Sequence, residues 1–325
     1  MDIVLQILLL VVGFVLLIKG ADWLVGGASS TALNFKIPKM LIGLTIVAFG
    51  TGAPELAVSI SSMLSGNTDM LLGNVVGSNI LNILLLIGIG AVVRPIAVKR
   101  ASIRKELILL IVATLAMVIL FLDTLITGAA SNTISRSDAL IFVLLFGVFL
   151  FFIAQSTRKN RQEKKKKRGE KPQYTLGKSL ILVVVGLAGI VGGSQLVVNS
   201  ASAIAAAVGI SDRIIALTIV AFGTSLPELI TTITAAKRGE HELLVGNIIG
   251  SNIFNICIVL GLPVLIFGTI TPSSFEVIDL IAVVVAVFVL YFMTLKDRKI
   301  TRIEGALMLL IFASYYSYII YGALA

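Results

Sequence analysis

Apolar residues fill this 325-residue chain in long runs, and short polar segments separate the runs at regular intervals. A run of about 20 apolar residues is long enough to cross a lipid bilayer as an α-helix. The pattern predicts ten membrane-spanning helices, over residues 3–20, 40–64, 70–92, 103–122, 138–155, 176–198, 213–236, 243–267, 276–294 and 303–323. We therefore expect an all-α, polytopic membrane protein.

The composition agrees with a membrane protein. Hydrophobic residues make up 58% of the chain, charged residues 13%, and the mean hydropathy is +1.06, whereas a soluble domain carries about 25% charged residues. No basic segment precedes the first apolar run, so we expect a retained helix and not a signal peptide. The single cysteine, Cys257, excludes an internal disulfide bond and a metal site built from cysteines.

Positive charge gathers in residues 156–178, which contain ten Lys and Arg and two Glu. Basic loops lie in the cytoplasm, and alternating the ten helices from this loop leaves only Arg136 and Arg213 outside. We expect a multi-pass protein of the cell (plasma) membrane with both termini extracellular. Nucleic-acid binding is the alternative, but aromatic residues do not alternate with the basic ones, so the expected partner is the lipid bilayer.

The chain contains an internal repeat. Leu44–Thr51 returns without change as Leu217–Thr224, 173 residues later, and Gly73–Ile80 returns as Gly246–Ile253 with conservative changes. Because each half has five predicted helices, an odd number, the second half is expected to insert upside down. We expect a first half over residues 1–155, a basic linker over 156–175 and an inverted second half over 176–325. Inverted repeats are typical of secondary transporters, with the site at the midplane.

Glycine, proline and glutamate interrupt one helix of each half, at Gly50–Glu55 and Gly223–Glu228. Proline removes a backbone donor, so both helices should break near the midplane and free carbonyl oxygens. The freed carbonyls are expected around Ala48, Thr51, Ala221 and Thr224. A simple kink is the alternative, but a carboxylate inside the membrane, present in both copies, indicates a functional site.

Amides and hydroxyls recur in the following helix of each half. Asn74, Ser78 and Asn82 share one helical face, and the second half repeats that face as Asn247, Ser251 and Asn255. Such side chains often only join helices by hydrogen bonds, which is what we expect of Asn79 and Asn252, which lie off this face. Beside a glutamate-bearing break, the other six are predicted to be neutral oxygen ligands.

Together these residues predict a site with two carboxylates and neutral oxygens, and without imidazole, thiolate or basic groups. Hard oxygens with a formal charge of −2 suit Ca²⁺, which takes 6–8 oxygen ligands, whereas softer metals favour nitrogen or sulfur. Two neighbouring glutamates do not readily ionise together in an empty site. Protons and monovalent cations are therefore expected to compete for the same oxygens.

With these motifs, the chain resembles the cation/Ca²⁺ exchanger superfamily, in particular prokaryotic sodium/calcium exchangers. The resemblance implies ten helices in two inverted five-helix repeats, and Na⁺/Ca²⁺ antiport by alternating access in which the first and sixth helices slide past a static core. It implies no enzyme activity, no cofactor besides the transported ions and no protein partner. It implies Ca²⁺ binding by Glu55, Glu228 and the carbonyls of Thr51 and Thr224, and Na⁺ sites that involve Ala48, Ser78, Asn82, Ala221, Ser225, Ser251 and Asn255.

Two positions deserve comparison with the family pattern. Gly52 stands where serine is usual, so one hydroxyl ligand of a Na⁺ site is missing, and this leaves the stoichiometry and the counter-ion open. Asn255 stands where potassium-dependent relatives carry aspartate, which argues against K⁺ co-transport.

The leading hypothesis is an electrogenic Na⁺/Ca²⁺ antiporter, and a Ca²⁺/H⁺ antiporter that uses the same glutamates is the alternative. A channel would share the polar lining but has less reason for two inverted, charged breaks. An intramembrane enzyme is disfavoured because the lone histidine, His241, lies in the polar segment 238–242 and no protease motif is present.

Overall fold

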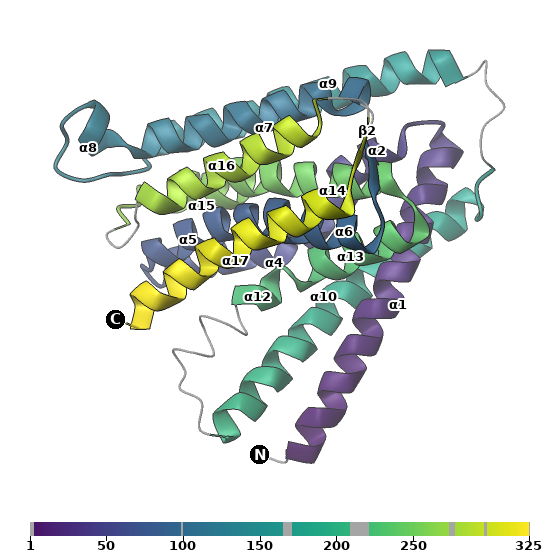
Figure 1. The fold of residues 1–325 in the computed structure, drawn as a ribbon, viewed down its shortest axis with the longest axis horizontal. Helices are drawn as coiled ribbons and strands as arrows, with labels where there is room; N and C mark the ends of the chain where they lie inside the picture. The colour runs from purple at the N-terminus through teal and green to yellow at the C-terminus, as the bar shows by residue number, and fades with distance from the viewer. Residues whose placement is uncertain are drawn as a thin grey trace.

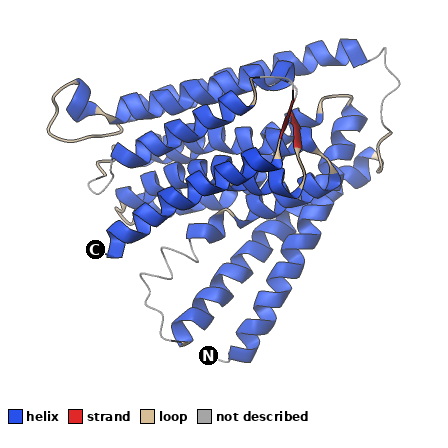
Figure 2. Cartoon of the chain, viewed as in Figure 1, coloured by secondary structure: helices blue, strands red, loops and turns tan. Residues whose placement is uncertain are grey.

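The computed structural model describes residues 3–98, 100–164, 171–208, 221–272, 277–295 and 298–324. Within these residues the chain is mostly helical, and a two-stranded antiparallel ribbon pairs β1 (Ile96–Val98) with β2 (Arg298–Ile300) (Figures 1 and 2). The predicted all-α class is therefore confirmed for the described part of the chain.

The described helices follow the predicted apolar runs. Those of the first half are α1 (Ile3–Phe35), α2 (Lys39–Ile42), η1 (Gly43–Val47), α3 (Ala48–Thr51), α4 (Ala53–Leu64), α5 (Thr68–Ile80), η2 (Leu81–Leu86), α6 (Ile87–Val93), α7 (Arg100–Phe121), α8 (Asp123–Ile126) and α9 (Arg136–Lys164). Those of the second half are α10 (Leu176–Ala207), α12 (Ala221–Thr224), α13 (Leu226–Arg238), α14 (His241–Phe254), η4 (Asn255–Leu260), α15 (Gly261–Phe267), α16 (Val277–Met293) and α17 (Arg302–Leu324). The start of the seventh predicted helix and part of the basic linker lie outside the described residues.

Several of these helices are long and apolar enough to cross a membrane. By length and composition alone, the described residues contain five such helices, and the bent pair Lys39–Thr51 and Ala53–Leu64 makes a sixth. The chain is therefore a multi-pass membrane protein. The full set of ten helices in two inverted repeats stays a prediction.

Helices α1 and α10 extend well beyond the predicted ends at residues 20 and 198. They have 33 and 32 residues, which corresponds to about 50 Å at 1.5 Å per residue, against roughly 30 Å for a hydrocarbon core. The prediction ended α1 where polar residues begin. In the structure the C-terminal part of α1 instead buries small residues, from Ala28 to Ala32, against the rest of the protein.

The two long helices lie side by side and run antiparallel (Figure 1). Glycines seven residues apart, at 13, 20 and 27 in α1 and at 186 and 193 in α10, form their contact. A Cβ atom on Gly193 would lie 2.8 Å from the carbonyl oxygen of Gly13, and one on Gly186 would lie 2.8 Å from that of Gly20. The two backbones therefore touch, as small residues allow in membrane helix pairs.

Alanine substitutions at two neighbouring glycines should distinguish the effect of this contact on stability from the effect of helix propensity. Gly193→Ala is expected to destabilise the protein by about 1–3 kcal/mol, because the added methyl group overpacks the α1–α10 contact. Gly192 faces open space, so Gly192→Ala should be neutral or stabilise by up to about 1 kcal/mol. Thermal unfolding of the purified variants in detergent measures both, and equal melting temperatures would contradict the contact as described.

Contacts near the ends of the predicted helices join segments that the alternation of these helices places on one side. On the predicted cytoplasmic side, Lys39 pairs with Glu240 at 2.9 Å, Asp22 pairs with Arg238 at 2.9 Å, and β1 pairs with β2. On the predicted outer side, Ile134 and Ile270 form a backbone bridge. These pairings agree with the predicted alternation, since none of them joins one predicted side to the other.

Candidate ion-binding site

Both predicted helix breaks are present in the structure. The helix axis bends by 44° between Lys39–Thr51 and Ala53–Leu64. Gly52 stands at the first break with φ −79° and ψ 3°, and Ser225 stands at the second with φ −89° and ψ 4°. Pro54 and Pro227 lie in the first turns of α4 and α13, where a missing backbone donor is tolerated. The two breaks therefore share one backbone geometry.

The prolines also free carbonyl oxygens. Because proline has no N–H, Pro54 and Pro227 cannot donate to the carbonyls four residues earlier, those of Gly50 and Gly223. The Ser194 hydroxyl of α10 donates to the Gly223 carbonyl at 2.8 Å. The sequence predicted free carbonyls around Ala48 and Thr51 in place of Gly50, but the Ala48 carbonyl accepts from the Gly52 N–H at 3.0 Å. The four-residue rule would have identified Gly50 and Gly223, whereas the sequence holds no signal for Ser194.

Short π-helices flank the motif residues. Segment η1 ends directly before Ala48, η2 contains Asn82, and η4 begins at Asn255. A π-helix inserts an extra residue per turn and is frequent at functional sites. A π-helix rotates the residues that follow it about the helix axis, relative to their positions in a regular α-helix. Asn82 and Asn255 therefore share the predicted helical face of Ser78 and Ser251 only approximately.

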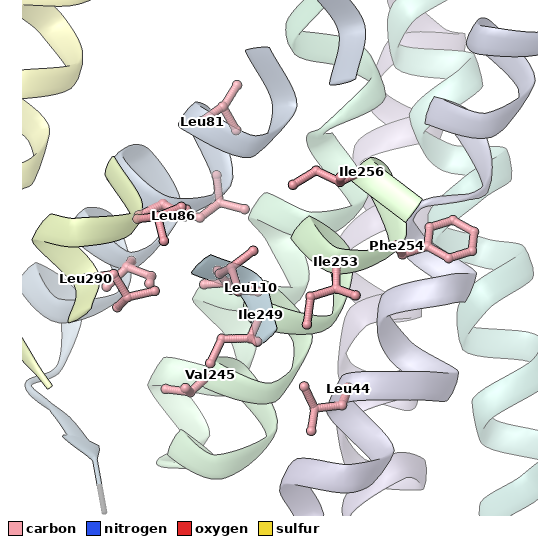
Figure 3. Close-up of a cluster of buried hydrophobic side chains, with 14 of the residues drawn as sticks. Leu44, Leu81, Leu86, Leu110, Val245, Ile249, Ile253, Phe254, Ile256 and Leu290 are labelled. Atoms are coloured by element: carbon pink, nitrogen blue, oxygen red, sulfur yellow. The ribbon is translucent and has the colours of Figure 1, made fainter. Parts of the chain in front are cut away.

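Glycines bring the second and eighth predicted helices into backbone contact. A Cβ atom on Gly250 of α14 would lie 2.6 Å from the carbonyl oxygen of Leu44 and 2.9 Å from the Cβ of Ala48. Leu44 of η1 and Val245, Ile249 and Ile253 of α14 belong to one cluster of buried apolar residues (Figure 3). The first break of one half is thereby held beside α14 of the other.

The two carboxylates lie close together and are shielded from solvent. Glu55 and Glu228 are each 1% exposed. The Ser225 hydroxyl of the second half donates to Glu55 Oε1 of the first half at 3.5 Å, and Glu228 interacts electrostatically with Glu55 and by hydrogen bonding with Thr51. The two breaks thus contribute to one site. The described residues contain no group of three or more His, Cys, Asp and Glu that could hold a metal ion, so this site combines a carboxylate pair with neutral oxygens.

Several oxygens of the site have no hydrogen-bond partner among the described residues. They are Oε2 of Glu55, Oε2 of Glu228, Oδ1 of Asn82, Oγ of Ser251 and Oδ1 of Asn255, and all of them are buried. A buried polar atom without a partner is costly. Cations that bind between these oxygens would remove that cost, which is the physical reason to regard the cluster as an ion site.

Asn74 and Asn247, two of the six predicted oxygen ligands, differ in their surroundings. Both polar atoms of the Asn247 side chain are buried without a hydrogen-bond partner among the described residues, whereas Asn74 has structural partners. The Asn74 amide donates to the Glu55 carbonyl at 3.0 Å and to the Ser59 hydroxyl at 3.2 Å, so it braces α4 just after the first break. Asn79 accepts from Asn255 of the other half at 3.4 Å, which confirms its predicted role between helices. The same prediction for Asn252 is wrong, because its amide donates to the Ile248 carbonyl of its own helix at 2.7 Å.

The predicted ligand residues come from elements that contact one another. Ala48, Thr51 and Glu55 belong to α3 and α4, Ser78 and Asn82 to α5 and η2, Thr224, Ser225 and Glu228 to the second break, and Ser251 and Asn255 to α14 and η4. Helix α4 contacts α5 and η4, and α13 contacts α3, η2 and α14. Ala221 begins α12, and its side chain lies outside the described residues.

Fold and site together define a polytopic membrane protein in which two repeated helix breaks place a pair of carboxylates at one buried, oxygen-lined position. The sodium/calcium exchanger protein family matches residues 5–155 and 178–321. The chain belongs to this family, and the resemblance inferred from its motifs is confirmed.

Similarity to individual proteins extends over nearly the whole chain. The putative antiporter CaxA of Alkalimonas amylolytica is 40% identical over 94% of this chain and 95% of its own length. The sodium/calcium exchanger MaX1 of Methanosarcina acetivorans is 29% identical over 96% and 98%, respectively. A solved structure of the sodium-calcium exchanger NCX_Mj, soaked with 10 mM Na⁺ and zero Ca²⁺, superposes with a TM-score of 0.84 at 30% identity, covering 97% of this chain and 99% of that one.

Proposed function

We propose that this protein exchanges Na⁺ for Ca²⁺ across the cell membrane by alternating access, and that the exchange is electrogenic. The observation that carries this proposal is the pair Glu55 and Glu228, brought together from two repeated breaks and surrounded by unpartnered neutral oxygens. Membership of the sodium/calcium exchanger family supports it.

In the proposed site, Ca²⁺ binds the carboxylates of Glu55 and Glu228 and the backbone carbonyls of Thr51 and Thr224. Sodium ions bind oxygens of Ala48, Ser78, Ala221, Ser225 and Ser251, with Asn82 and Asn255 between the two carboxylates. Both ions use the same carboxylates, so binding one lowers the affinity for the other. If the protein changes between its inward-open and outward-open states only with ions bound, this competition produces exchange. It requires no enzymatic step or cofactor.

In the proposed topology, ten helices form two inverted five-helix repeats, over residues 1–155 and 176–325. The 156–178 segment is cytoplasmic and both termini are extracellular. The same-side pairing of loops supports the alternation, and the position of the basic residues supports the orientation. The close glycine contact between α1 and α10 supports their movement as one body past the site.

Ca²⁺/H⁺ antiport is the second candidate, and Gly52 is the observation in its favour, because a missing hydroxyl weakens one Na⁺ site but not a proton site. Radioactive calcium uptake into proteoliposomes separates the two candidates. Vesicles loaded with Na⁺ and diluted into Na⁺-free medium should accumulate Ca²⁺, and an imposed pH gradient alone should drive much less. Uptake that follows the pH gradient and ignores Na⁺ would replace the Na⁺ proposal with H⁺ coupling.

Membrane potential tests electrogenicity in the same vesicles. If more than two Na⁺ leave per Ca²⁺, each surplus charge adds about 2.3 kcal/mol of driving force per 100 mV. An inside-positive potential should then accelerate uptake. An uptake rate and a final Ca²⁺ gradient that do not respond to potential would show electroneutral exchange.

A further inference from the structure

The two halves differ at a pair of neighbouring positions. The repeat aligns Gly52 with Ser225 and Leu81 with Phe254, so the first break lacks a hydroxyl and the helix beside it carries a ring. Gly52 has a negative φ of −79°, close to the −89° of Ser225. Backbone geometry therefore does not require glycine at position 52, and another cause must be sought for its presence.

The ring of Phe254 lies where a side chain at position 52 would begin. A Cβ atom on Gly52 would lie 3.0 Å from Phe254 Cδ1 and 3.2 Å from Cε1, both tighter than ordinary contacts. These two atoms are neighbours on one edge of the ring. In Figure 3 the Phe254 ring and the Ile256 side chain point in opposite directions. The side chains at 52 and 254 are thus complementary in size.

Other aromatic residues hold the Phe254 ring in this position. It stacks on Phe49 with ring centroids 5.0 Å apart and an interplanar angle of 25°, and it meets Phe146 of α9 edge-on at 6.2 Å. Phe49 and Phe146 also contact each other at 5.4 Å. A ring fixed on two sides does not readily give way to a larger residue at position 52, since packed interiors resist small-to-large changes.

The second half has a different arrangement. Phe222, the repeat equivalent of Phe49, packs against Tyr316 and Phe312 of α17, with centroids 5.4 Å and 6.5 Å away. The Ser225 hydroxyl is free of such a ring and reaches Glu55 Oε1 at 3.5 Å. No hydroxyl at position 52 can make the matching contact to Glu228. The pseudo-symmetric site therefore has a hydroxyl at the second break and an aromatic ring at the matching position of the first.

We propose that the half-site at the first break binds Na⁺ more weakly than the half-site on the Ser225 side, because the Phe254 ring lies where a hydroxyl-bearing side chain would begin. This inference rests on the proposed Na⁺/Ca²⁺ exchange. A cation that leaves water needs oxygen atoms around it, and the edge of an aromatic ring carries partial positive charge. Phe254 thus removes one ligand position and also makes it unfavourable for a cation. At a given Na⁺ concentration, fewer Na⁺ ions are therefore expected to bind than with hydroxyls at both breaks.

A double variant that copies the second half into the first tests this directly. Gly52→Ser combined with Phe254→Leu restores the pairing seen at Ser225 and Leu81. The matched control, Gly52→Ala with Phe254→Leu, opens the same space and adds a Cβ atom but no hydroxyl. The Na⁺ dependence of radioactive calcium uptake and the Na⁺:Ca²⁺ ratio at flux equilibrium under a clamped voltage are measured for the wild type and both variants.

The serine variant should show a higher Hill coefficient for Na⁺ and a higher Na⁺:Ca²⁺ ratio than the wild type, while the alanine control matches the wild type. If neither variant transports, Na⁺-dependent thermal stabilisation of the purified proteins gives the same comparison, because a ligand that binds the folded state raises its stability. The serine variant should then gain more stabilisation per decade of Na⁺ than the control.

Equal Na⁺ numbers in all three proteins would overturn the inference and leave Na⁺/Ca²⁺ exchange intact. Wild-type uptake driven by the pH gradient and indifferent to Na⁺ would instead overturn the proposed function, and this inference with it. The two failures are therefore distinguishable in one set of vesicles.

Discussion

Glu55→Gln and Glu228→Gln are each expected to lower Ca²⁺ exchange at least about 100-fold. Each substitution keeps the size of the side chain but removes half of the formal negative charge that faces a buried divalent cation. Removing one partner from a buried charge pair costs about 3–5 kcal/mol, and each 1.4 kcal/mol is a factor of ten in affinity. Because the pair is 1% exposed, solvent cannot compensate for the loss.

Glu106→Gln provides the matched control, because Glu106 is also a buried carboxyl group, 6% exposed, but lies in α7 outside the site. It should retain exchange of the order of the wild type. Initial rates of radioactive calcium uptake into Na⁺-loaded proteoliposomes, normalised to reconstituted protein, give the comparison. Normal exchange by either site variant would show that the two carboxylates do not form the Ca²⁺ site.

Asn82→Leu is expected to weaken ion binding without lowering the stability of the ion-free protein. Both polar atoms of the Asn82 side chain are buried without a partner, and the residue is 1% exposed. Leucine has a similar volume and removes the unsatisfied amide, so the protein without ions should be as stable as the wild type or more stable. Loss of a proposed Na⁺ ligand should meanwhile raise the internal Na⁺ concentration for half-maximal Ca²⁺ uptake at least about tenfold, since a single hydrogen bond to a charged group contributes roughly 1.5–3 kcal/mol.

Asn252→Leu is the control for this change. The Asn252 amide donates to the Ile248 carbonyl of its own helix, so its loss should affect stability more than Na⁺ dependence. Thermal unfolding and the Na⁺ dependence of Ca²⁺ uptake, measured for both variants, give the two readouts. An unchanged half-saturating Na⁺ concentration for Asn82→Leu would remove Asn82 from the proposed Na⁺ ligands.

The sequence predicted the features that depend on local chemistry. Proline and glycine residues located both helix breaks, apolar runs located the described helices, and the alternation of these helices predicted which segments lie on the same side. The repeat also predicted that Glu55 and Glu228 belong together, which the structure supports through the Ser225–Glu55 contact.

Features that depend on packing between distant segments could not be predicted. The extension of α1 beyond residue 20 depends on burial of its small residues, and the Ser194–Gly223 hydrogen bond joins two helices without any local signal. The π-helices change the register of Asn82 and Asn255 without a distinctive sequence pattern. The role of Phe254 became visible only when its ring was found beside Gly52.

The two halves of the repeat agree at the carboxylates and differ at the neighbouring hydroxyl position. The carboxylate pair consists of the same residue in both halves, Glu55 and Glu228. The neighbouring positions differ, because Gly52 and Phe254 lie at the first break where Ser225 and Leu81 are their repeat equivalents, and the two half-sites are therefore unequal. An exchanger with unequal halves can keep its Ca²⁺ site while its number of Na⁺ sites changes. The coupling number is therefore expected to depend on the packing around Gly52 and not on the glutamates.

Simultaneous measurement of both ions is the most direct test of Na⁺/Ca²⁺ exchange. Proteoliposomes loaded with radioactive sodium and diluted into radioactive calcium should release Na⁺ in a fixed ratio to the Ca²⁺ they take up. Both fluxes should disappear together in Glu55→Gln. Calcium uptake without sodium release, or sodium release that continues at the same rate without external calcium, would contradict the account.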